Sequence, residues 1–176
     1  MAALALGADG RLFFHNDELG LIGAIEPTTG QMIGSYQLGA VPIRADFEGI
    51  AVTATEVVMV TSDGVLYRAP LPPRDRDRGV LPATVVSTGL GRQCEIEGLT
   101  FDPGPGELLL ACKSPRTKAL KDQVAVFPWF LATGALAAPV TMGALAPTKE
   151  TLASFTCRLP ARPDACSAPS MMCQRP

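Results

Sequence analysis

The chain has 176 residues, a formal net charge of −2 and 47% apolar residues. This composition is typical of one folded globular domain and argues against a disordered chain. The 15 basic and 17 acidic residues nearly balance, which argues against a nucleic-acid surface or a polybasic membrane patch. The longest apolar runs fall short of the ~20 residues of a membrane-spanning helix. Residues 1–7 lack the basic start and the length of a signal peptide, so the sequence as written predicts a cytoplasmic protein.

Gly and Pro are numerous, at 17 and 16 residues, and this favours many short strands joined by turns. A first unit spans residues 7–45 and a second spans residues 46–93. The strands that we expect in the first unit are Arg11–His15, Leu21–Ile25 and Gln31–Leu38, and those in the second are Gly49–Thr53, Glu56–Thr61, Val65–Ala69 and Thr84–Thr88. The charged, proline-rich stretch Pro70–Gly79 predicts an exposed loop.

A third unit spans residues 94–146. We expect its strands at Glu97–Phe101, Glu107–Lys113, Gln123–Trp129 and Ala138–Leu145. Because proline cannot donate to a sheet ladder, Pro128 indicates a strand end or a sheet edge. Residues 1–147 therefore form the predicted folded domain. Residues 148–176 differ in character from the rest, and residues 158–176 show neither strand nor helix periodicity. This predicts an irregular or disordered tail over residues 148–176, or the out-of-frame end of an interrupted gene.

One short motif occurs twice, as Asp46–Ala51 and as Glu95–Thr100. Each copy reads acid, apolar, acid, glycine, apolar, small. The central residues Glu48 and Glu97 are 49 positions apart, which is the length of one four-stranded propeller blade. The sequence therefore predicts an all-β fold, a partial β-propeller of about three four-stranded antiparallel blades.

The repeated acids are the leading candidates for a binding site. Successive side chains of a strand point to opposite faces, so the two acids of each motif are expected on one face. If these strands line a propeller channel, the carboxylates converge there and offer the oxygen ligands that calcium or another divalent cation prefers. The candidate metal ligands are Asp46, Glu48, Glu95 and Glu97. The alternative is that one acid of each pair accepts hydrogen bonds from the turn that enters the blade.

Weaker ligand candidates lie in a turn and at a strand end. Asn16, Asp17 and Glu18 occupy a turn that could reach the channel mouth, although an Asx-turn explains them better. Lys113 ends an apolar strand and either pairs with a channel carboxylate or lies on the surface. His15 is the single histidine and fits a strand residue better than a catalytic base.

The cysteines number five and are widely spread, which argues against a disulfide framework. Cys94 and Cys112 lie in strand-like surroundings and are expected to pack as small apolar side chains. A zinc site is improbable with one histidine and no C-x-x-C pair.

Taken together, these motifs resemble the SdiA-regulated (YjiK-like) β-propeller family, and more distantly the esterase-like phytase, SMP-30 and NHL-type propellers. The resemblance covers residues 7–146, and the stretches that carry it are Asp46–Ala51, Val60–Gly64 with Leu66–Tyr67, Cys94–Pro103 and Leu108–Lys113. It implies a closed ring of about six blades, of which this chain holds three. Either the chain is a fragment, or a homodimer closes the ring, or the gene is broken.

The resemblance leaves the function open between three alternatives. The first is a propeller that binds a small-molecule ligand or a divalent cation through channel carboxylates, without catalysis. The second is a metal-dependent hydrolase of an ester, lactone or phosphoester, in which the ion polarises the substrate. The third is an inactive truncated fragment.

Overall fold

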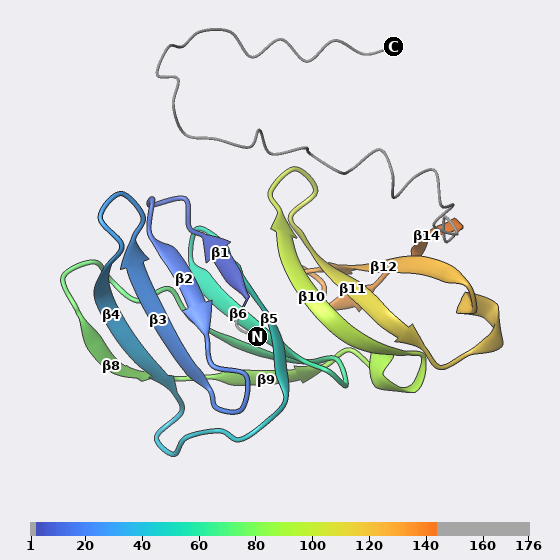
Figure 1. Ribbon diagram of the computed structural model, residues 1–176, viewed down its shortest axis with the longest axis horizontal. Helices are drawn as coiled ribbons and strands as arrows, with labels where there is room; N and C mark the ends of the chain where they lie inside the picture. Colours follow the sequence, from blue (N-terminus) through green and yellow to red (C-terminus); the bar gives the residue numbers. More distant parts are fainter. Residues whose placement is uncertain (1–2, 144–176) are drawn as a thin grey trace, which may run out of the picture. The chain divides into compact units, whose positions relative to one another are not determined.

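The computed structural model describes residues 3–143, which form three consecutive β-sheets (Figure 1). We call these sheets blade 1, blade 2 and blade 3 in chain order. Within residues 3–143 no helix is long and apolar enough to cross a membrane. The predicted tail at residues 148–176, with its three cysteines, lies outside the described residues.

Blade 1 has the strand order β1-β2-β3-β4-β8. Its strands are β1 (Leu4–Leu6), β2 (Leu12–His15), β3 (Leu21–Glu26), β4 (Gln31–Leu38) and β8 (Arg78–Leu81). The three predicted strands of this unit are confirmed as β2, β3 and β4. The strands β1 and β8 were not predicted, and β8 pairs in parallel with β4 after the chain has already built most of blade 2.

Blade 2 has the order β5-β6-β7-β9 and matches the four predicted strands closely. Its strands are β5 (Phe47–Val52), β6 (Glu56–Thr61), β7 (Val65–Pro70) and β9 (Thr84–Ser87). The predicted loop after β7 is exposed from Pro73 to Asp77, but its last two residues, Arg78 and Gly79, begin β8. The stretch therefore crosses from blade 2 to the outer edge of blade 1.

Blade 3 consists of β10 (Cys94–Asp102), β11 (Glu107–Pro115), β12 (Gln123–Phe130), β13 (Ala135–Leu136) and β14 (Val140–Gly143). Both β13 and β14 pair with β12. Pro128 lies inside β12, and its carbonyl accepts the N–H of Ala137, in the gap between these two outer strands. The nitrogen of Pro128, which carries no hydrogen, faces the same gap. The hydrogen-bond ladder between β12 and β11 therefore loses no donor.

The apolar core lies in two layers between neighbouring blades. The layer between blades 1 and 2 contains Phe13, Tyr36 and Phe47, and the layer between blades 2 and 3 contains Phe127 and Trp129. Each layer is built from the alternate residues of facing strands, as stacked sheets require. Each middle strand is therefore covered on both sides only where a neighbouring blade exists.

The two cysteines of blade 3 form a disulfide, with their Cα atoms 5.7 Å apart. The prediction that Cys94 and Cys112 pack without a disulfide was wrong, although Cys94 is buried in the core as expected. Strand register brings the two cysteines within bridging range, because β10 and β11 are antiparallel neighbours. Counting cysteines along the sequence could not reveal this register.

Candidate cation site on the inner strands

The repeated motif forms a β-bulge in both blades. In blade 2, Phe47 pairs with Thr61 and Gly49 with Val60, so Glu48 has no partner of its own. A bulge inserts one extra residue, bends its strand and redirects the side chain. The simple face alternation expected from the sequence therefore does not describe the position of Glu48.

Blade 3 repeats this arrangement and adds a second irregularity. Ile96 pairs with Cys112 and Gly98 with Ala111, which leaves Glu97 unpaired in the ladder. Because Glu95 pairs with Ser114, Lys113 on the opposite strand is also left out of the ladder. Two bulged residues of opposite charge thus lie side by side.

Lys113 forms ion pairs with both acids of the second motif. Its Nζ atom lies 2.9 Å from Oε1 of Glu97 and 3.7 Å from Oε1 of Glu95. The hydrogen bond to Glu97, followed by the charges of Glu97, Glu95 and Glu48, raises the pKa of Lys113. The alternative that Lys113 pairs with a carboxylate of the inner strands is the one that the structure contains.

Glu48 lies within the field of this cluster, although it belongs to blade 2. Partial burial, followed by the charges of Asp46 and Glu97, raises the pKa of Glu48, and Lys113 opposes the rise. The structure thus brings the two motifs together, with four carboxylates and one ammonium group. Within residues 3–143, no three or more His, Cys, Asp or Glu side chains are grouped closely enough to hold a metal ion. The metal assignment therefore stays a prediction.

The three polar residues of the β2–β3 turn lie beside the first motif. The carboxamide oxygen of Asn16 accepts the N–H groups of Glu18 and Leu19, which is the expected Asx-turn. The carbonyl of Asp17 accepts the N–H of Phe47 at 2.7 Å, and this joins the turn to the start of β5. The geometry supports a structural role for the turn at the seam of blades 1 and 2.

His15 is a buried strand residue with both ring nitrogens engaged. Its Nε2 accepts the N–H of Ala3 at 3.2 Å, and its Nδ1 lies 2.9 Å from the carbonyl of Asn16. These partners require the neutral ring with the proton on Nδ1. Burial lowers the pKa of His15, which favours the same neutral form.

The inner strands of all three blades line a common hollow. It has a volume of about 290 Å³, and its lining comes from β1, β5 and β10: Leu4, Ala5, Leu6, Ile50, Val52, Leu99, Thr100 and Phe101. Thr100 is the one polar side chain among these eight residues. The four candidate acids lie nearer the starts of β5 and β10, so they flank the hollow and do not line it.

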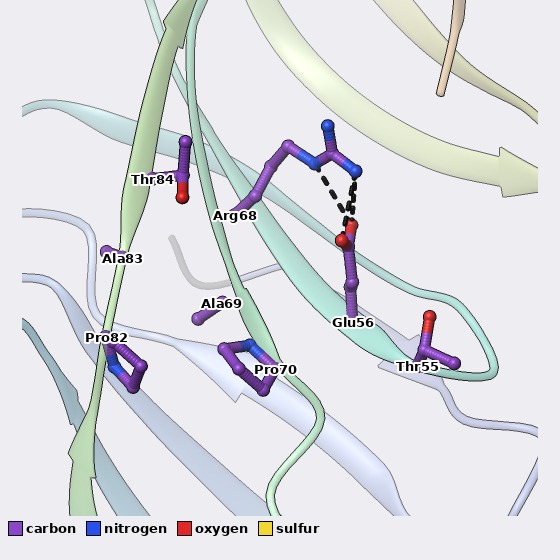
Figure 2. A pocket seen from close by; sticks show the side chains of 8 residues that line it. All are labelled: Thr55, Glu56, Arg68, Ala69, Pro70, Pro82, Ala83 and Thr84. Carbon is purple, nitrogen blue, oxygen red and sulfur yellow. Dashed lines mark hydrogen bonds and ion pairs between the residues drawn. The ribbon is translucent and has the colours of Figure 1, made fainter. Parts of the chain in front are cut away.

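A second pocket, of about 470 Å³, lies where β6 and β7 meet the chain that leads into β9 (Figure 2). Sequence reasoning missed the ion pair in it, because the register of β6 and β7 brings its partners together. Two nitrogens of Arg68 contact Oε2 of Glu56, at 2.8 and 3.0 Å, and the side chains point toward one another in Figure 2. The Arg68 guanidinium also lies 5.7 Å from the centre of the Trp129 ring. Arg68 therefore links blade 2 to blade 3 through a cation–π contact.

Comparison with solved structures identifies the fold. The chain superposes on the β-propeller domain of Myceliophteria thermophila Cps50 (Swd1) with a TM-score of 0.50 and 15% identity, over 80% of this chain and 41% of that one. Kuenenia stuttgartiensis hydrazine synthase gives a TM-score of 0.48 and 12% identity, over 80% of this chain and 49% of that one. The likeness to the Cps50 domain shows that the chain is a partial β-propeller. The chain spans less than half the length of either structure. No protein-family model and no curated protein matches it.

Proposed function

We propose that this chain is part of a β-propeller of the SdiA-regulated kind that binds a divalent cation, with calcium as the first candidate, or a small cationic ligand. The four ligands would be the carboxylates of Asp46, Glu48, Glu95 and Glu97. The observation that carries the proposal is the pair of equivalent bulges, which brings Glu48 of one blade into the field of Glu97 of the next. Bulges recur next to functional sites because they redirect side chains.

The charge of the cluster supports a cation as its ligand. Lys113 supplies one positive charge against four carboxylates, so an excess of negative charge remains. Burial is the first cause of the raised pKa of Glu48, and the charges of Asp46 and Glu97 add to it. A calcium ion would relieve the repulsion and would take oxygen ligands from two strands at once. Lys113 would have to move aside, and its exposure permits this.

Calorimetric titration of calcium into the full chain tests the proposal. We expect saturable binding to the wild-type protein and none to Glu48→Gln or Glu97→Gln. Lys113→Met should bind more tightly than wild type, because it removes the competing charge. Asp75→Asn, an exposed change in the loop between β7 and β8, is the matched control and should bind like wild type.

The pKa of Glu48 supplies a control for folding. A carboxyl group whose pKa rises on folding stabilises the folded protein at pH values below its unfolded pKa. This contribution is lost as the pH rises through the folded pKa. Charged Glu48 is therefore unfavourable at pH 7, and Glu48→Gln should keep or raise the melting temperature there. Wild-type protein that is folded yet takes up no calcium contradicts the proposal, and so does equal binding by all variants. Hydrolysis would need the bound ion, so esters and lactones are assayed only if the titration is positive.

A further inference from the structure

The glycine that follows each bulge marks where the next blade packs. A Cβ atom at Gly49 would lie 2.7 Å from the backbone nitrogen of Leu99 and 2.8 Å from its Cβ. Real Cβ atoms essentially never approach so closely, so the inner strand of blade 3 lies directly on Gly49. This position admits only glycine because the neighbouring blade occupies the space.

Gly98 holds the same place in blade 3, but no other blade within residues 3–143 covers it. Both glycines follow a bulged glutamate and pair with the strand next to them, Gly49 with Val60 and Gly98 with Ala111. A Cβ atom at Gly98 would meet only the Cβ of Ala111, at 3.2 Å, among the described residues. The chain thus carries the glycine that a following blade requires, with no blade on it.

The face of blade 3 around Gly98 is apolar and exposed. On β12, Ala125, Phe127 and Trp129 point into the core toward blade 2, so the alternate residues point away from it. Directly paired residues share a face, which places the partners on β14 on that same side. The apolar residues that β12 and β14 contribute to this free face are Val124, Val126, Phe130, Val140 and Met142, and Met142 is 61% exposed.

Blade 1 presents a matching free face at the other end. On β2, Phe13 and His15 are buried toward blade 2, so Leu12 and Phe14 point the other way. Their partners on the neighbouring strands lie on that same side. The free face of blade 1 therefore includes Leu4, Leu6, Leu12, Phe14 and Ile25, with Leu4 and Leu6 61% and 66% exposed.

Strand register identifies Leu4 as the counterpart of Leu99. Leu4 pairs with Phe14. Phe14 directly precedes His15, which is the last residue of β2 that pairs with β3. In blade 2, Ile50 pairs with Met59, which likewise precedes the last residue of β6 that pairs with β7. Leu99 follows the glycine of its motif, just as Ile50 does. Ile50 is buried against blade 1 and Leu99 packs into the layer shared with blade 2. Leu4 alone of the three has no blade to pack on.

We propose that a second copy of this chain covers both free faces, with Leu4 of each copy lying on Gly98 of the other. A two-fold axis through the centre of the ring then relates the two copies, so that two sets of three blades close into six. In each interface, one copy contributes blade 1 and the other contributes blade 3. A two-fold pair buries both apolar faces at once, which one additional strand would not do. This inference is independent of cation binding.

Light scattering coupled to gel filtration of the full chain tests the proposal. We expect the mass of a dimer for wild type and of a monomer for both Leu4→Asp and Gly98→Val. Leu4 is exposed in the single chain, so its substitution leaves the fold intact, and circular dichroism checks this. Val85→Asp changes an exposed apolar residue on β9, away from both faces, and should remain a dimer.

A mixture of the two monomeric variants gives the sharpest outcome. In a ring of one Leu4→Asp copy and one Gly98→Val copy, one interface carries both substitutions and the other carries neither. The mixture should therefore form dimers to a greater extent than either variant alone. A monomeric, monodisperse wild type overturns the proposal, as does a mixture no more associated than its components, or aggregation that Val85→Asp shares equally.

Discussion

At the scale of single residues, His15 makes the fold sensitive to pH. Its folded pKa lies below the unfolded value of about 6.5. The folded state therefore takes up fewer protons, and stability is complete above the unfolded pKa and falls as the pH drops below it. Protonation also removes the acceptor that holds the N–H of Ala3 beside β1.

We expect the melting temperature of wild type to fall between about pH 6.5 and pH 5, and this fall to be shallower in His15→Gln. Scanning calorimetry at several pH values measures the difference. Asn16→Asp would be a poor control because it adds a charge beside the ring, so Gln37→Glu on β4 is used instead. Equal slopes in wild type and His15→Gln would show that His15 has no part in the pH dependence.

The sequence singled out the candidate acids, but it did not predict their surroundings. The repeated motif pointed to Glu48 and Glu97, and the structure places them in equivalent bulges. The sequence left open whether Lys113 pairs with a carboxylate or lies on the surface. Its ion pair with Glu97 depends on a second bulge, and no local sequence pattern predicts that bulge. A one-residue shift in register changes every neighbour of a strand residue. The interactions between charged residues of different blades could therefore be identified only from the structure.

At the scale of elements, the strands with a strong apolar pattern were predictable. Central strands such as β6 and β11 have dense β-branched or leucine-rich sequences and were recognised at nearly their true bounds. β1 and β8 were missed because their partners are set by tertiary topology. The apolar-Ala-apolar pattern of Leu4–Leu6, shared with Ile50–Val52, is the signal that could have revealed β1.

The disulfide of blade 3 ties the two strands that carry most of the candidate site. It links cysteines 18 positions apart. Closing a loop of roughly 15 residues in the unfolded chain contributes about 3 kcal/mol to stability. The double variant Cys94→Ser with Cys112→Ser should therefore lose about 3 kcal/mol of unfolding free energy, measured by urea denaturation. Dithiothreitol should lower the stability of wild type and leave the double variant unchanged, whereas an equal response of both would place the effect at other cysteines.

At the scale of the whole molecule, the number of blades followed from the 49-residue repeat, but closure of the ring did not. A repeat shows how often a blade recurs, and each blade buries its faces only against a neighbour. Gly98 is informative here because its counterpart Gly49 shows what such a glycine accommodates. Only the comparison of a covered and an uncovered blade face pointed to the proposed interface.

Closure by a second copy couples stability to concentration. If folding and association are linked, the melting temperature rises with protein concentration, because mass action favours the dimer. We expect calorimetric scans over a hundredfold dilution series to show this rise for wild type and for Val85→Asp. Leu4→Asp, as a monomer, should melt at one temperature throughout and below wild type at every concentration. A wild-type melting temperature that does not change with dilution, together with a monomeric mass, would show that these three blades stand alone with both apolar faces in water.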